Sequence, residues 1–353
     1  MFSLVTNPLP LCPTLLGLVL RNLPGNEEFL NLPESWGIKI KAFGLACIFL
    51  RAGLEIDLAE IIRQGAVATR LTVMPGVSEA LTVAGMGVVL FDMPFMLACS
   101  MGFILAAVSP AVVVVGMFNM QSMGYGVAKG VPTLVVAAAS FDDVVALTGF
   151  SVFIGNAIPS DHGMLITALH APIEVLGACI FGYMGGQLLG CTTMFNTHFM
   201  RVLSTLFVGL FFMFTAVHYQ YNSMGALGCL VTGFFAAKRW TDGKMGWLSG
   251  EVSSHWAHDV EHDIAKIWSN FAQPLLFSVI GSSINFTTID TTTILPALAV
   301  IAVGSCVRVS VAILVTWGNN LSWLERAFIG LSWIPKATVQ VPPSLSLDFV
   351  TAS

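Results

Sequence analysis

The chain has 353 residues, with 15 Lys and Arg against 20 Asp and Glu, a formal net charge of −5 and a mean hydropathy of +0.82. Charged residues make up only 10% of the chain, whereas soluble domains carry about 25%. These values exclude a soluble enzyme, a nucleic-acid-binding protein and a disordered protein. They indicate an all-α polytopic membrane protein whose surroundings are the lipid bilayer.

The hydrophobic pattern predicts eleven helical segments, most of them near the ~20 residues that cross a bilayer. In chain order they cover residues 9–22, 37–52, 71–91, 94–118, 131–158, 163–190, 202–219, 223–240, 264–284, 296–317 and 326–340. We expect one transmembrane domain over 1–340 and a non-helical tail over 341–353.

Basic residues are distributed unequally between the two sets of connections. The connections at 51–70, 119–130, 190–201, 238–266 and 318–326 together hold ten Lys or Arg, and the opposite set holds three. Because cytoplasmic loops carry the excess of Lys and Arg, we expect the first set to face the cytoplasm.

Six ionisable residues remain inside the predicted spans. They are Glu79, Asp142, Asp143, Glu174, Arg308 and Lys336. Each such group costs about 2.5–3.5 kcal/mol at the bilayer centre, so each is a functional hypothesis. At ~1.5 Å of rise per residue, Asp142, Asp143, Arg308 and Lys336 fall near the midplane. Glu174 lies apart from these four, and we expect it to serve packing, a dimer contact or a lipid headgroup.

Two of the predicted spans contain a proline near the same depth. Pro110 lies in Val-Ser-Pro-Ala and Pro335 lies in Trp-Ile-Pro-Lys, and proline removes a backbone donor from a helix. Ordinary kinks are one interpretation. The predicted topology runs these spans in opposite directions, which is typical of an inverted-repeat transporter with two discontinuous helices.

The adjacent acids Asp142 and Asp143 lie at the depth of these prolines. Neighbouring helical residues diverge by about 100°, so we expect one carboxylate to face a water-filled cavity and the other to pair with a cationic side chain. A carboxylate at the midplane can bind either a proton or an alkali cation. Competition for one carboxylate is sufficient for proton–cation exchange, which favours a secondary transporter over an enzyme.

Several motifs together resemble one known family. They are Ser-Phe-Asp-Asp at 140–143, Val-Ser-Pro-Ala-Val-Val-Val at 108–114, Gly-Tyr-Gly-Val-Ala-Lys-Gly-Val-Pro-Thr-Leu at 124–134, Arg-Ala-Gly-Leu-Glu at 51–55, Gln-Pro-Leu-Leu-Phe at 273–277 and Trp-Ile-Pro-Lys-Ala-Thr-Val-Gln at 333–340. The chain resembles the sodium/hydrogen exchanger-like domain-containing antiporters, the NHA-type branch of the monovalent cation:proton antiporters, from about residue 14 to 340.

The resemblance implies a role for each matching residue. Asp143 would be the ion- and proton-binding carboxylate, and Asp142 would assist it. The resemblance also implies a salt bridge between Glu79 and Arg308. Supporting positions in the two discontinuous helices would be Ser109, Pro110, Lys336 and Thr338.

The resemblance also implies an assembly and a cargo. It implies homodimers that work by an elevator-like movement, exchange Na⁺ or Li⁺ for H⁺ and need no cofactor. The family carries at least one further helix before 9–22 and one after 340, so the chain is expected to lack terminal helices. A truncated, non-transporting isoform or a modulatory subunit of such an antiporter therefore remains the alternative.

The sequence also contains residues of two other kinds of site, a metal site and a protease site. His255, His258 and His262 are spaced to share one helical face, which could hold zinc, although a solvated or pH-responsive stretch is the simpler interpretation. An intramembrane aspartyl protease needs two carboxylates that share a proton from different helices. Here the aspartates are adjacent on one helix and no Gly-x-Gly-Asp string occurs in the sequence, which argues against a protease.

Overall fold

The computed structural model describes residues 11–23, 33–56, 65–157, 164–190, 197–219, 221–242, 256–284, 286, 291–318 and 321–336. These segments are helical almost throughout, and they contain one isolated antiparallel bridge, between Val108 and Lys336. The chain divides into two compact units. The first unit falls within Asp57–Ile173 and Thr287–Ser353, and the second within Phe2–Ile56 and Glu174–Phe286.

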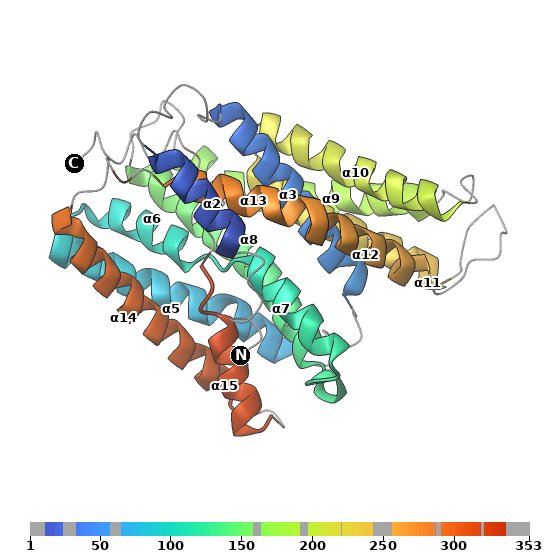
Figure 1. Cartoon of the computed structure of the whole chain (residues 1–353). Helices are drawn as coiled ribbons and strands as arrows, with labels where there is room; N and C mark the ends of the chain where they lie inside the picture. The colour runs from blue at the N-terminus through green and yellow to red at the C-terminus, as the bar shows by residue number, and fades with distance from the viewer. Residues whose placement is uncertain are drawn as a thin grey trace. The chain divides into compact units, whose positions relative to one another are not determined.

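The first unit is built around one long apolar helix. Its helices are α5 (Gly65–Phe91), α6 (Phe95–Ala106), α7 (Pro110–Ser122), α8 (Val131–Ala157), α14 (Thr291–Val315) and α15 (Trp323–Ser332). Helix α5 packs against α6, α8 and α14, and α14 packs against α15 (Figure 1). A short cluster of Ala80, Phe103, Ala106 and Phe150 fills the space between α5, α6 and α8.

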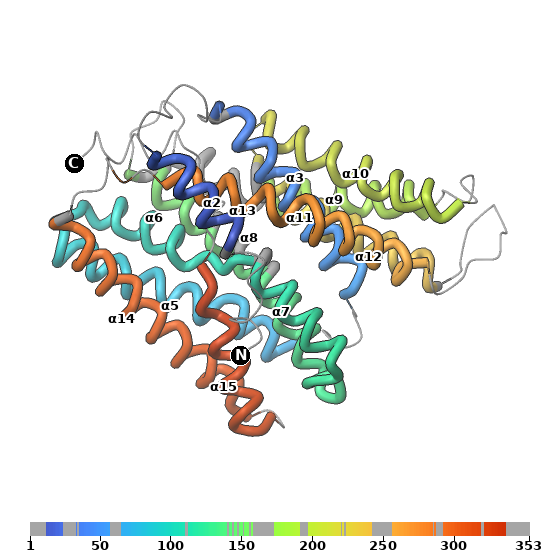
Figure 2. Tube along the Cα trace, viewed as in Figure 1, coloured from blue at the N-terminus to red at the C-terminus, as the bar shows by residue number. Residues whose placement is uncertain are grey.

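The segment 94–118 forms two helices with a break between them. Helix α6 ends at Ala106, Ala107 and Ser109 have extended backbones, and Pro110 begins α7. Proline fits this first helical position because its missing N–H would have no intrahelical partner there. The extended residues between the two helices can be followed in the trace of Figure 2.

The second break follows α15, which is shorter than the segment 326–340 expected from the sequence. This helix begins at a capping box formed by Ser322 and Glu325 and ends at Ser332, two residues before Ile334-Pro335. The two breaks meet, because the Ser109 N–H donates to the Pro335 carbonyl at 3.0 Å and Val108 forms its antiparallel bridge with Lys336. The expected interruption at Pro110 is therefore present, α15 ends before Pro335, and the residues that follow the two helices pair. Residues 337–340 and the predicted tail 341–353 lie outside the described residues.

An ion pair joins the start of α15 to the turn before α8. Lys129, at the end of the 3₁₀ turn η1 (Val127–Lys129), donates to Glu325 at 2.8 Å. This contact with Lys129, together with the capping contacts from Ser322, holds the pKa of Glu325 below its usual range. Gly126 and Gly130 flank the turn with φ of 70° and 63°, a backbone that glycine adopts without strain.

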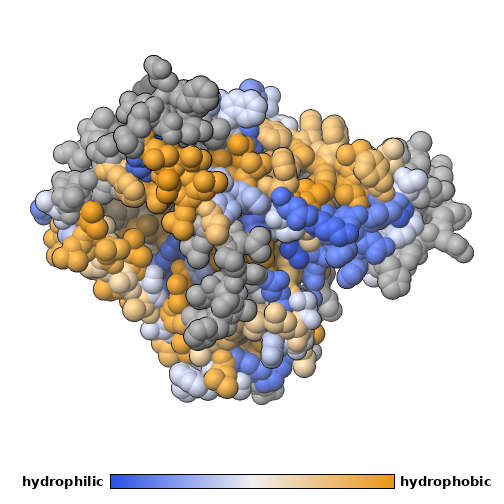
Figure 3. Space-filling view, in the orientation of Figure 1, coloured by the Kyte–Doolittle hydropathy of each residue, from blue (hydrophilic) through white to orange (hydrophobic). Residues whose placement is uncertain are grey.

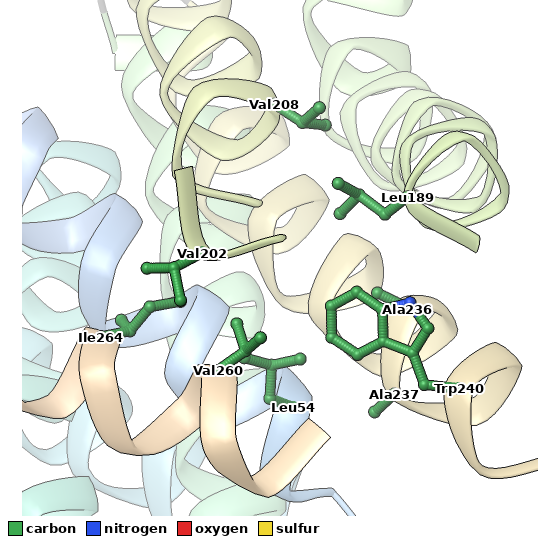
Figure 4. Packing of buried hydrophobic residues seen from close by; sticks show 9 residues of the cluster. All are labelled: Leu54, Leu189, Val202, Val208, Ala236, Ala237, Trp240, Val260 and Ile264. Carbon is green, nitrogen blue, oxygen red and sulfur yellow. The ribbon is translucent and has the colours of Figure 1, made fainter. Parts of the chain in front are cut away.

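The second unit packs its helices around apolar side chains. It contains α2 (Leu11–Asn22), α3 (Glu34–Glu55), α10 (His198–His218), α11 (Asn222–Asp242), α12 (Trp256–Ile267), α13 (Gln273–Ser282) and the part of α9 (Met164–Gly190) from Glu174 onward. Its apolar cluster brings together side chains from five helices (Figure 4): Leu54, Leu189, Val202, Val208, Ala236, Ala237, Trp240, Val260 and Ile264.

Helices α12 and α13 are joined by a five-residue π-helix, η3 (Trp268–Ala272). Pro274 lies just after it, and its ring cannot donate the backbone hydrogen bond that an α-helix requires. A π-helical turn absorbs this defect without ending the helix. The segment predicted at 264–284 therefore continues through its proline, unlike the segments that carry Pro110 and Pro335.

Glycines allow the helices of the second unit to approach closely. A Cβ atom on Gly53 of α3 would lie 2.1 Å from the Leu230 carbonyl of α11, and one on Gly281 of α13 would lie 2.0 Å from the Thr14 carbonyl of α2. Small residues at such crossings let helix backbones pack directly in membrane proteins.

Four helical stretches in the described part of the chain are long and apolar enough to cross a membrane. They are Gly65–Phe91, Ile173–Gly190, His198–His218 and Thr292–Val315. Shorter apolar helices cover Phe95–Ala106 and Val112–Ser122. Figure 3 shows hydrophobic residues spread over the visible surfaces of α10 and α14. Helix α10 carries Phe199, Phe207 and Phe211, each more than half exposed, which suits contact with lipid.

Two glycine-to-alanine changes, one at the crossing of α3 and α11 and one away from it, should have opposite effects. Gly53→Ala forces two backbones apart, so we expect it to lower stability by about 1–3 kcal/mol, as overpacking does. Gly228→Ala, on α11, meets its nearest atom at 3.9 Å. It should be neutral or stabilising, because alanine favours helices by about 1 kcal/mol. Thermal unfolding of the purified protein in detergent measures both, and equal shifts would contradict the packing argument.

Candidate functional site

A buried arginine lies at the centre of the first unit. Arg308 of α14 has no exposed surface, and its Nη1 donates to Glu79 Oε2 of α5 at 2.7 Å. Its Nη2 donates to Asp142 Oδ2 of α8, also at 2.7 Å. Nη1 also donates to the Ala106 carbonyl, at the end of α6. The planar fork of a guanidinium suits it to bond several acceptors at once.

The Ala106 carbonyl is available to Arg308 because α6 stops there. The last carbonyls of a helix lack intrahelical partners and need another donor when they are buried. The break that Pro110 imposes thus creates an acceptor, and Arg308 satisfies it. The local backbone and the buried charge stabilise each other.

A second base reaches the same acid from the other broken helix. Lys336 follows Pro335, and its Nζ forms an ion pair with Glu79 Oε1. Glu79 is 1% exposed, and each of its two carboxylate oxygens is bonded to a different basic side chain. We call Glu79, Asp142, Arg308 and Lys336 the four-charge network. Its two acids and two bases cancel in formal charge, which reduces the cost of burying them.

Two glycines make room for the carboxylates of the network. A Cβ on Gly76 of α5 would lie 2.8 Å from Asp142 Oδ1, and one on Gly304 of α14 would lie 3.2 Å from Glu79 Oε1. Any larger residue at Gly76 would therefore press on the carboxylate that Arg308 binds.

The structure brings together most of the residues that the sequence singled out, but not all of them. Ser109, Asp142, Arg308 and Lys336 meet in the first unit, where Pro110 begins α7. Asp143 follows Asp142 in α8. The side chain of Asp143, together with Thr338 and His255, lies outside what the structure describes.

The remaining candidates belong to the second unit. His258 and His262 lie on α12, and Glu174 of α9 accepts a hydrogen bond from the Met224 N–H of α11 at 3.1 Å. In the part of the chain that the structure describes, no group of three or more His, Cys, Asp or Glu side chains could hold a metal ion.

Helix α5 begins earlier than the sequence indicated. The span was expected to start at 71, whereas α5 starts at Gly65, and Glu79 stands near the middle of its 27 residues. The six residues before 71, Gly65 to Arg70, extend the helix by more than a turn. The ion pair of Glu79 with Lys336 had no signal in the sequence, because it depends on how the two breaks cross.

The family model described as sodium/hydrogen exchanger, transmembrane, matches residues 14–342. The chain belongs to this sodium/hydrogen exchanger family. The resemblance inferred from the motifs is therefore confirmed, and the chain is a multi-pass membrane protein.

Sodium/hydrogen exchanger 9B2 of Mus musculus is 32% identical over 362 residues, covering 99% of this chain and 63% of that protein. Sodium/hydrogen exchanger 9B2 of Homo sapiens is 33% identical over 356 residues, covering 96% and 62%. The chain thus spans less than two thirds of the length of these relatives.

Solved structures support the fold. Two structures of the sodium proton antiporter MjNhaP1 from Methanocaldococcus jannaschii match with TM-scores of 0.67 and 0.71 at 17% and 18% identity. They cover 97% and 98% of this chain, and 79% and 78% of those chains. The prediction of an all-α, polytopic antiporter fold is confirmed.

Replacement of Arg308 tests how far the first unit depends on the network. Arg308→Gln leaves Glu79 and Asp142 buried without their common base, and breaking a buried pair in this way destabilises a protein by about 3–5 kcal/mol. We expect a large drop in thermal stability in detergent, with Arg308→Lys intermediate. Arg70→Gln, at an exposed position on α5, is the control and should change little. A drop no larger than that of the control would contradict the central role of Arg308.

Proposed function

We propose that this chain carries the ion-exchange site of a monovalent cation:proton antiporter. In this proposal Na⁺ or Li⁺ competes with H⁺ for Asp143, and Asp142 assists by holding one side of the site in place. The observation that carries the proposal is the four-charge network, which lies at the crossing of two broken helices and includes the neighbour of Asp143.

The charge balance of the network supports Asp143 as the exchanging group. Asp142 is bonded to Arg308, and Glu79 is bonded to both bases. These four charges cancel, so none of them is left over to neutralise an ionised Asp143, which the proposal takes as the exchanging group. An uncompensated charge in a low-dielectric interior is unfavourable. A bound alkali cation or a proton removes it, and the two exclude each other.

The broken helices supply what a small cation needs besides the carboxylate. Hard cations prefer oxygen ligands, and interrupted helices present free carbonyls near the midplane. At this crossing the Ala106 and Pro335 carbonyls already accept hydrogen bonds, from Arg308 and from the Ser109 N–H. We therefore assign any further backbone ligand to the Val108 carbonyl beside them.

We propose that the chain works as a homodimer in a lipid bilayer with alternating access to the site, as the resemblance to NHA-type antiporters implies. Sodium/hydrogen exchanger 9B2 and MjNhaP1 are named for exchange of the same two ions. No enzymatic step and no cofactor enter the proposed cycle, since binding and release of two ions are sufficient.

Flux measurements on Asp143→Asn test the proposal. The purified chain is reconstituted in liposomes containing a pH-sensitive dye, and an inward Na⁺ or Li⁺ gradient is applied. We expect wild-type protein to move protons and Asp143→Asn to show only background flux, because asparagine neither binds a proton nor supplies a negative charge. Glu174→Gln is the matched control, since it removes a buried carboxylate of the second unit and should retain flux.

Equal flux from wild type and Asp143→Asn would overturn the assignment of the site. If neither carries flux while both fold normally, the modulatory-subunit alternative is favoured. Loss of flux in Glu174→Gln equal to that in Asp143→Asn would show that any buried acid matters, and would remove the specific case for Asp143.

A pair of glycines on α5 tests the positioning of the acids. Gly76→Ala brings a methyl group within 2.8 Å of Asp142 Oδ1, whereas Gly85→Ala meets no atom within 4 Å. We expect Gly76→Ala to shift Asp142 and to lower flux several-fold while the protein still folds. Gly85→Ala should transport like wild type, and the same flux from both variants would argue against a positioning role for Asp142.

A further inference from the structure

Helix α12 is held on the second unit along one side. Its Glu261 accepts a hydrogen bond from Arg51 of α3 at 2.6 Å, and its Asp263 lies 2.6 Å from His198 of α10. The Arg201 guanidinium of α10 stacks 4.1 Å from the centre of the Trp256 ring. Val260 and Ile264 of the same side are fully buried. These contacts fix the helix and its rotation.

The other side of α12 presents two histidines. His258 and His262 are exposed and one helical turn apart, with ring centroids 6.5 Å apart and ring planes inclined by only 14°. Figure 3 shows the hydrophilic surface over α12. Within the part of the chain that the structure describes, neither ring takes part in a hydrogen bond or an ion pair, whereas Glu261 and Asp263 are engaged.

We propose that His258 and His262 bind one divalent transition-metal ion of the zinc, copper and nickel class. Residues four apart on a helix are neighbours on one face, and two histidines at this spacing form the metal-binding half of the His-Glu-x-x-His motif. Neutral imidazole suits these ions, and each Zn–N bond is about 2.0–2.1 Å. Binding requires that rotation of the two rings about their side-chain bonds turn one nitrogen of each toward a common point.

Two protein ligands make this an exchangeable site. Water completes the coordination, so the ion is in equilibrium with free metal and is not a structural part of the fold. Its binding bridges successive turns of α12 and stabilises that helix over its unfolded form. The site is chemically separate from the proposed transport site, because Na⁺ and Li⁺ prefer oxygen ligands.

Metal binding to the full chain tests this proposal. The protein is purified without a polyhistidine tag and dialysed against Zn²⁺, and bound metal is measured by mass spectrometry. We expect one saturable Zn²⁺ per chain, unaffected by excess Na⁺. His258→Gln and His262→Gln should each weaken binding at least 10-fold. His218→Gln replaces another exposed histidine of the second unit and should bind like wild type.

Spectroscopy of Cu²⁺-loaded protein counts the ligands. Electron paramagnetic resonance should show two nitrogen donors in wild type and one in each single variant. No saturable Zn²⁺ binding by wild type would overturn the proposal, as would binding unchanged in both variants. Zn²⁺ binding that appears only with metal-dependent dimerisation would also overturn it, because the two histidines would then belong to different chains. Both changed side chains are exposed, so the variants should fold normally, and their unfolding without metal checks this.

Discussion

The structure of the first unit depends on the burial of Arg308. A guanidinium with no exposed surface loses several kcal/mol of hydration free energy, and only close acceptors can offset that loss. Three acceptors surround it, from α5, α8 and the end of α6. Helix α14 can therefore occupy its place only if Glu79 and Asp142 face it and α6 ends at Ala106. One buried charge in this way fixes the rotation of two helices and the position of a break.

Lys336 connects this centre to the second broken helix. Its ion pair with Glu79 and its backbone bridge with Val108 lie one residue from the Ser109–Pro335 hydrogen bond. The crossing of the extended segments and the network are consequently one structure, since the backbone pairing brings the lysine to the acid. A displacement at either break changes the electrostatic surroundings of Asp142, which is the property that an ion site coupled to a conformational change requires.

Features that depend on neighbouring residues could be predicted from the sequence, whereas features that depend on contacts between distant segments could not. The breaks at Pro110 and Pro335 were predicted because proline acts on its own turn, and the charges were found because an apolar span makes them conspicuous. The pairing of Glu79 with Lys336 has no such local signal, because it depends on three separate segments. The roles of Gly76 and Gly304 depend on a few tenths of an ångström between helices, which no pattern in one sequence reveals. Of the three histidines predicted on one face, the described structure supports two as neighbours.

Both units pack helix backbones closely at glycines, but the described part of the first unit also joins its helices by ion pairs whose side chains are almost completely buried. In the second unit glycines such as Gly53 and Gly281 bring backbones into contact, and apolar side chains fill the space beside them (Figure 4). In the first unit glycines give space to carboxylates, and ion pairs join the helices. Apolar contacts change little with ionic conditions, because they carry no charge. The buried ion pairs of the first unit respond to an added cation or proton, because the four charges already balance one another and cannot neutralise a fifth. In the proposed cycle, the buried ionic interior of the first unit is therefore the part of the fold that an exchanged cation or proton would affect most.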